Sequence, residues 1–188
     1  MLIALIIVIV LVVIVVVAVV AIYNGLVKRR QQVDNSWSQI DVQLKRRHDL
    51  IPNLVEAVKD YMQYEKETLT KVTEARAAAI SAGAQGPQAQ AQAENMLTGA
   101  LKSLFAVVEN YPDLKANQNV MSLQEELTTT ENKISFARQF YNDSVMTFNV
   151  KIQQFPSNVI AGMFNFHERQ FFQGEEADRE VPKVDLSS

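Results

Sequence analysis

The chain opens on an unbroken apolar run, and apolar residues then recur at helical spacing among polar ones. Residues 2–22 are all Leu, Ile, Val or Ala. A helix of this length reaches roughly 32 Å, which matches the hydrocarbon thickness of a bilayer. A lone segment in lipid satisfies its backbone groups only as a helix. The run therefore predicts a transmembrane anchor over residues 1–23. A cleaved signal peptide is disfavoured, because no basic residue precedes the run and the run is longer than usual.

The charges beside the run predict its orientation. Lys28, Arg29 and Arg30 follow it, whereas only Met1 precedes it. Since basic flanks stay on the cytoplasmic side, we expect the N-terminus outside and residues 24–188 in the cytoplasm. The same three residues are candidates for contact with anionic lipid, although an ordinary solvated helix face would have the same composition.

Beyond the anchor, amphipathic stripes predict helices over residues 24–50, 52–81, 88–110 and 118–154, within a helical bundle at 24–162. The last of these keeps a near-seven repeat, which is typical of a bundle or coiled-coil seam. Residues 163–188 form a tail that is first aromatic and then acidic. Its aromatic part is predicted either to lie in the lipid interface or to cover the open end of the bundle; these residues are Met163, Phe164, Phe166, Phe171 and Phe172.

Pro52 leaves two arrangements open within an all-α fold. If the chain turns back there, the anchor is followed by an up-and-down four-helix bundle. If Pro52 only kinks the chain, residues 24–81 form one long helix in a three-helix antiparallel arrangement. That helix would be about 87 Å long and would outreach its neighbours. Length therefore favours the four-helix bundle.

The composition argues against chemistry at an active site. The net charge is −3, so no nucleic-acid partner is indicated, and there is no cysteine. The two histidines, His48 and His167, lie far apart in sequence. No metal-ligand spacing, nucleophile elbow or phosphate-binding loop is present in the sequence. We therefore expect neither an enzyme nor a bound metal, cofactor or small-molecule substrate.

A dense polar set near Pro52 is the candidate site. At spacings of three and four, Arg46 can meet Asp49, and Asp49 can meet Asn53. One interpretation is a hinge and salt-bridge cluster that fixes the turn; the other is a site for a partner protein or a lipid head group. The candidate residues are Trp37, Arg46, Arg47, Asp49, Pro52 and Asn53.

Several strings resemble the LemA family of bacterial membrane proteins. They are YNGLV at residues 23–27, WSQIDVQLKRR at 37–47, DLIPNLVE at 49–56, YPDLKA at 111–116 and the run at 123–142. The resemblance covers nearly the whole chain. His48 and Met121 stand where other residue types are commoner. The resemblance implies one N-terminal span, a short extracellular N-terminus and a soluble helical bundle, but it supplies no activity.

These observations predict a membrane-anchored helical scaffold at the bacterial cytoplasmic (inner) membrane. We expect it to form a homo-oligomer and to bind protein partners, other membrane proteins among them. The alternative is a lipid-binding protein that shapes membranes, which would use the basic stretch and the aromatic tail. An enzyme of unknown type is a third alternative, with no catalytic pair in the sequence to support it.

Overall fold

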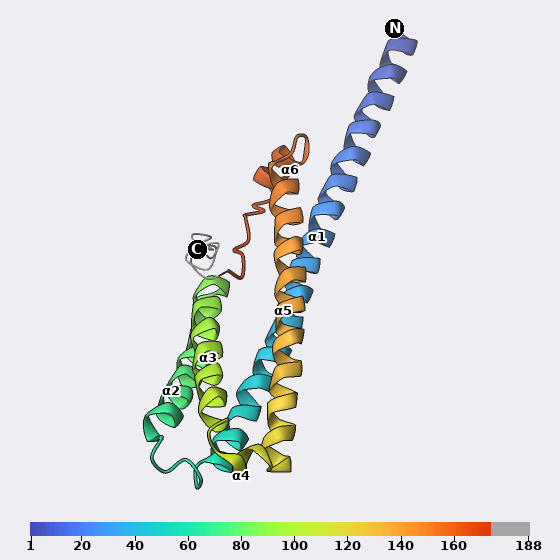
Figure 1. Ribbon diagram of the computed structural model, residues 1–188. Coiled ribbons are helices and arrows are strands. Elements are labelled where there is room, and N and C mark those ends of the chain that lie inside the picture. Colours follow the sequence, from blue (N-terminus) through green and yellow to red (C-terminus); the bar gives the residue numbers. More distant parts are fainter. Residues whose placement is uncertain (174–188) are drawn as a thin grey trace, which may run out of the picture. The chain divides into compact units, whose positions relative to one another are not determined.

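The computed structural model describes residues 1–173, and every regular element within them is a helix (Figure 1). The elements are α1 (Leu2–Val58), α2 (Lys66–Ala82), the 3₁₀ turn η1 (Gly83–Gln85), α3 (Pro87–Val108), α4 (Pro112–Lys115), α5 (Gln118–Gln153) and α6 (Ser157–Met163). The prediction of an all-helical chain with one long apolar N-terminal helix is confirmed. The acidic part of the predicted tail lies outside the described residues.

The predicted break at Pro52 is wrong, because α1 passes through this proline and ends at Val58. The alternative prediction, one long helix over residues 24–81, is also wrong, because α1 ends at Val58 and α2 begins only at Lys66. The turn falls in residues 59–65, where the backbone N–H groups of Tyr61 and Met62 both donate to the carbonyl oxygen of Val58. Met62 is fully buried. The chain thus turns where an apolar side chain can be buried, and the proline is accommodated by a bond described below.

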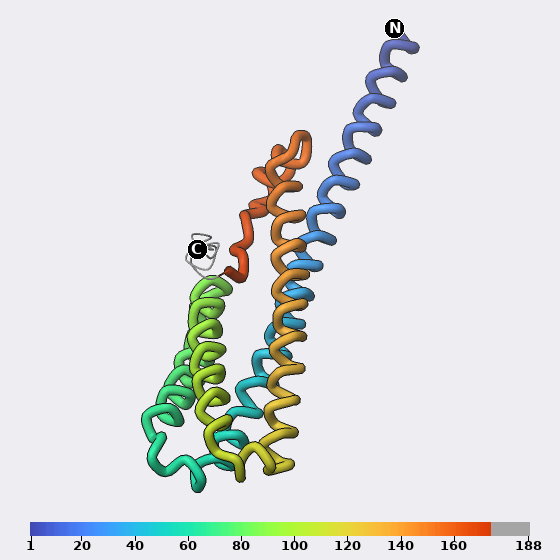
Figure 2. The backbone as a smooth tube through the Cα atoms, in the orientation of Figure 1, coloured from blue at the N-terminus to red at the C-terminus, as the bar shows by residue number. Residues whose placement is uncertain are grey.

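The chain contains two compact units, which are described separately. Within the described residues, unit 1 comprises 1–41 and 136–170, and unit 2 comprises 42–135 and 171–173. α1 and α5 each contribute residues to both units. Figure 2 traces the path of the backbone through them.

Unit 2 is built on a core shared by four helices. α2 and α3 form a hairpin through η1 and Gly86, which has a positive φ of 104°. Glycine adopts this conformation without steric cost, and Pro87 then begins α3 with a preset φ. The core side chains are Ile51, Leu54 and Val58 of α1, Met62 of the turn at 59–65, Val72 and Ala79 of α2, Leu97, Leu101, Leu104 and Val108 of α3, Leu114 of α4, and Val120 and Leu127 of α5.

Unit 1 pairs the first part of α1 with the second part of α5. The rings of Trp37 and Tyr141 lie 5.3 Å apart between their centroids, so the two helices pack side by side. The apolar run of α1 is long enough to cross a membrane, and its most hydrophobic stretch is not buried by the rest of the chain. This exposed apolar helix fits a single-pass membrane protein.

Candidate functional site

The most unusual feature of unit 2 is a buried arginine. Arg47 lies on the inward face of α1, one turn beyond Leu44 and one turn before Ile51, and its side chain is only 1% exposed. Its guanidinium donates to carboxylate oxygens of Glu94 on α3 and Glu131 on α5. A buried cation needs such partners, because its desolvation is otherwise too costly.

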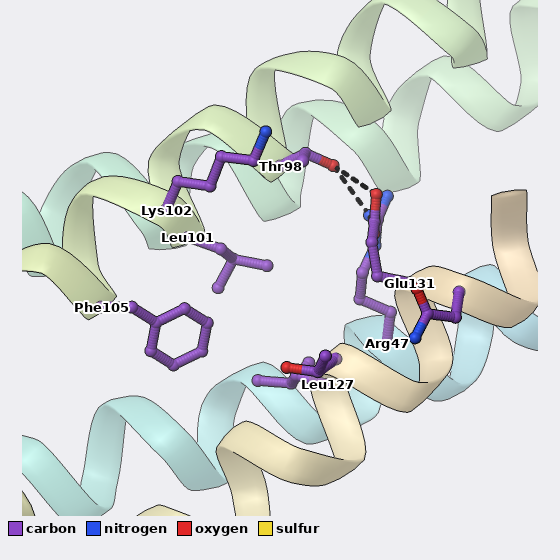
Figure 3. Close-up of a pocket in the computed structure, with 9 residues that line it drawn as sticks. Arg47, Thr98, Leu101, Lys102, Phe105, Leu127 and Glu131 are labelled. Carbon is purple, nitrogen blue, oxygen red and sulfur yellow. Dashed lines mark hydrogen bonds and ion pairs between the residues drawn. The ribbon is translucent and has the colours of Figure 1, made fainter.

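Two neighbours complete the cluster. The Nη1 atom of Arg47 also donates to the Thr98 hydroxyl at 3.0 Å, and that hydroxyl lies 3.3 Å from Glu131 Oε1 (Figure 3). The Nε2 atom of His48 lies 2.9 Å from Glu94 Oε1. We refer to Arg47, His48, Glu94, Thr98 and Glu131 as the Arg47 cluster. It joins α1, α3 and α5 within unit 2.

Glu94 is the carboxylate on which the cluster depends. Its side chain is 3% exposed. Burial raises the pKa of Glu94, but the hydrogen bond from His48 and the charge of Arg47 outweigh burial and hold that pKa below its ordinary value. Glu94 is therefore ionised at neutral pH, and the ionic pair with Arg47 is maintained.

Next to the cluster, a side chain of α2 supplies the hydrogen bond that is missing from α1 at Pro52. Proline has no N–H, so the carbonyl oxygen of His48, four residues earlier, has no helical donor. The Nε–H of Arg76 on α2 donates to this oxygen at 2.7 Å. A side chain from the neighbouring helix thus replaces the missing hydrogen bond. This contact explains why α1 continues past Pro52 to Val58.

We expect Arg76→Met to lower the free energy of unfolding by about 1–3 kcal/mol, because it leaves the His48 carbonyl without a donor. The matched background is Pro52→Ala, which restores the missing N–H. In that background the same Arg76→Met change should cost about 1 kcal/mol less. Denaturant unfolding of the full-length chain in mild detergent, followed by circular dichroism, measures all four proteins. Equal costs in both backgrounds would contradict this account of Pro52.

A cavity of about 190 Å³ lies beside the Arg47 cluster in unit 2. Leu101, Phe105 and Leu127 give it an apolar wall, and the cluster residues lie at one end (Figure 3). The full lining is Arg47, Thr98, Leu101, Lys102, Phe105, Leu127, Thr128, Glu131 and Asn132. Arg47 and Glu131 at its end are paired with each other, so these two charges hold α1 to α5 within unit 2.

The residues predicted around Pro52 do not gather into one site. Arg47 enters the core, whereas Arg46 is exposed and lies 3.5 Å from Glu126. The side chains of Asp49, Pro52 and Asn53 are also exposed. Trp37 belongs to unit 1, where it contacts Tyr141. Within residues 1–173, no group of three or more His, Cys, Asp or Glu side chains could hold a metal ion.

Sequence reasoning missed His48, Glu94, Thr98, Glu131 and Arg76. One signal was available: Glu94 lies three residues before Leu97, on the same stripe of α3 that supplies the core. A carboxylate on an apolar stripe indicates a buried charge that needs a cation. Arg47 occupies the equivalent position on α1.

The basic residues after the apolar run lie in unit 1. Lys28 and Arg30 are exposed and Arg29 is partly buried. The guanidinium carbon of Arg30 lies 5.1 Å from the centroid of the Phe166 ring, close enough for a cation–π contact. Phe166 is buried, so this part of the aromatic tail covers the body of unit 1.

The segment after α6 is fastened to α1 and α5 by polar contacts. The backbone N–H of Arg169 donates to Asn149 Oδ1 and the Asn149 amide donates to the Arg169 carbonyl, both at 2.9 Å. The Arg169 side chain reaches Asp34 at 3.0 Å. The Tyr141 hydroxyl donates to the carbonyl of Gln170, and burial raises the pKa of Tyr141. These bonds fix the position of the chain just after Phe166.

The chain is similar to one protein family and to several known proteins. The family model described as the LemA family matches residues 36–186. Protein LemA of Metamycoplasma hominis is 28% identical, over 83% of this chain and 71% of that protein. Magnetosome protein MamQ 2 of Paramagnetospirillum magneticum is 26% identical, over 82% of this chain and 66% of that protein. Magnetosome protein MamQ of Magnetospirillum gryphiswaldense is 24% identical, over 80% and 64%. The chain thus spans just under two thirds of these magnetosome proteins.

Proposed function

The chain belongs to the LemA family, and from that premise we propose that it is a membrane-anchored helical scaffold that self-associates and binds protein partners. The observation that carries this proposal is a pair of exposed features in unit 1. One is the apolar run of α1, which fits a membrane span. The other is an apolar stripe on α5, which no part of the described chain covers.

The stripe consists of large side chains on one side of α5. Phe136 is 73% exposed and Phe140 is 44% exposed. Farther along α5, Met146 and Val150 are also exposed, and the exposed Asp143 lies between them and Phe140. Large apolar groups arranged along a helix are typical of a surface that another helix covers. A second copy anchored in the same membrane is the occupant that we propose.

The positions of the charges support the remaining parts of the proposal. Lys28, Arg29 and Arg30 favour a cytoplasmic location for the residues after the span, at a bacterial inner membrane. The Arg47 cluster supports a non-catalytic role, because its charged groups are paired with each other. The alternative of a lipid-binding, membrane-shaping protein is supported by the same basic residues, which can meet anionic lipid.

We expect the full-length protein to behave as an oligomer in mild detergent, and Phe136→Glu combined with Phe140→Glu to dissociate it. Each buried phenylalanine contributes about 1.5–3 kcal/mol to such a contact. The double variant should therefore raise the dissociation constant by at least about 100-fold. Size-exclusion chromatography with light scattering, over a range of concentrations, measures the change.

The matched control is Gln32→Glu combined with Gln39→Glu, which adds the same charge at exposed positions of α1 in the same unit. This variant should keep the oligomeric mass of the native protein. A native protein that is strictly monomeric at every concentration would refute self-association. Equal dissociation of both double variants would show that added charge, rather than the stripe, is responsible.

A further inference from the structure

α6 exposes Val159 and Met163, which are one helical turn apart, and Phe155 just before α6 is also exposed. Phe155 is 82% exposed, Val159 is 52% exposed and Met163 is 69% exposed. In contrast, the buried face of α6 is formed by Ser157, Ile160 and Ala161. A helix in water normally turns its larger apolar groups inward. Here Val159 and Met163 face outward instead, which indicates that the surroundings of these two side chains are not water.

The place of α6 in unit 1 indicates what those surroundings are. Tyr23 directly follows the apolar run, and its ring centroid lies 4.7 Å from that of Phe164 and 5.9 Å from that of Phe166. Covering of the run begins at Val19, which is partly buried, whereas the residues before it are exposed. The end of α6 therefore lies beside the last turn of the apolar run, as Figure 1 also shows.

The charge pattern agrees with a location at a lipid surface. Residues 152–167 contain no Asp, Glu, Lys or Arg. Lys151 on α5 directly precedes this stretch, and on α1 Arg30 covers the Phe166 ring and Lys28 is exposed. An uncharged apolar face with basic residues behind it is typical of segments that lie in a membrane interface.

We propose that α6, with Phe155 and Phe164 on either side of it, is a second membrane contact that inserts its exposed apolar side chains into the lipid interface. Unit 1 is then held to the bilayer at two points, by the span and by α6. The inference rests on the proposed membrane span, because the contact between Phe164 and Tyr23 gives the depth only if residues 2–22 lie in lipid.

The absence of cysteine from the sequence permits a direct test. Single variants Val159→Cys and Met163→Cys of the full-length chain are labelled with an environment-sensitive fluorescent maleimide. They are reconstituted in vesicles of phosphatidylcholine and phosphatidylglycerol, some carrying a nitroxide at a shallow acyl position. Val16→Cys, within the span, is the positive control. Gln39→Cys, an exposed position about 24 Å along α1 from Tyr23, is the negative control.

We expect the nitroxide lipid to quench the labels at 159 and 163 several-fold more than the label at 39. Quenching at 16 without quenching at 159 and 163 would overturn the inference and leave the span intact. A blue shift at 159 and 163 that nitroxide lipid does not quench would assign this face to a second copy or another protein, and would also overturn it. Loss of quenching at 16 as well would overturn the proposed span together with the inference.

Discussion

Replacing Arg47 by methionine is expected to lower the free energy of unfolding by about 3–5 kcal/mol, because it leaves a buried carboxylate without its cation. Arg47 reaches Glu94, Glu131 and Thr98, and so connects three helices of unit 2. In the variant Glu94 keeps only the contact with His48 among these interactions. Denaturant unfolding of the full-length chain in detergent, monitored by circular dichroism, measures the loss.

The neighbouring residue supplies the control. Arg46→Met removes an equal charge, but Arg46 is exposed and its single ion pair with Glu126 is 3.5 Å long. That change should cost no more than about 1 kcal/mol. Adding Glu94→Leu to Arg47→Met should recover a large part of the loss, because it removes the unpaired charge. If Arg47→Met costs no more than Arg46→Met, the cluster does not hold the helices together.

The sequence carried enough information for most of the helices. The predicted segments 88–110 and 118–154 correspond to α3 (Pro87–Val108) and α5 (Gln118–Gln153). Both segments have regular apolar stripes and are bounded by Gly, Pro or Asn, so local signals determine where they begin and end. The apolar run is the clearest case, since no alternative structure suits such a composition in lipid.

The prediction of a helix break at Pro52 was wrong because a residue from another helix determines whether the helix continues there. Proline in a helix interior leaves one carbonyl unpaired, and local rules count this as a helix end. Arg76, 24 residues later in the chain, supplies the donor. Nothing in the local sequence around Pro52 indicates that donor. The chain therefore turns at residues 59–65 instead of at Pro52, and Met62 is buried in this turn.

The contacts of the Arg47 cluster also depend on residues from other helices, and these residues are still farther apart in the sequence. Glu94 lies 47 residues after Arg47, and Glu131 lies 84 residues after it. Sequence spacing could pair Arg46 with Asp49, but it could not join α1 to α3 and α5. The pairing of Arg47 with Glu94 could have been predicted in part, because both residues occupy core-facing positions on the apolar stripes of their helices.

Part of the predicted aromatic tail packs against the protein, and the rest keeps exposed surface. Phe166 and Phe172 are buried, which corresponds to packing against the protein. Met163, Phe164 and Phe171 keep exposed surface. Spacing could not separate these groups, because the segment after α6 has no helical period. Its course is instead determined by hydrogen bonds to Asn149 and Tyr141.

Deleting residues 2–22 is expected to convert the protein from one that resists alkaline carbonate extraction into one that is fully extracted. Eighteen of the 21 deleted residues are Leu, Ile or Val. Each favours insertion by about 0.3–0.6 kcal/mol, so the run contributes roughly 5–10 kcal/mol, or a partition ratio of more than about a thousandfold.

The interfacial contact proposed for α6 is of the peripheral kind, and carbonate should remove it. Replacing the run with 21 leucines is the matched control and should restore resistance to extraction. Extraction of the intact protein by carbonate would contradict the span, and with it the interfacial position proposed for α6, which rests on the span.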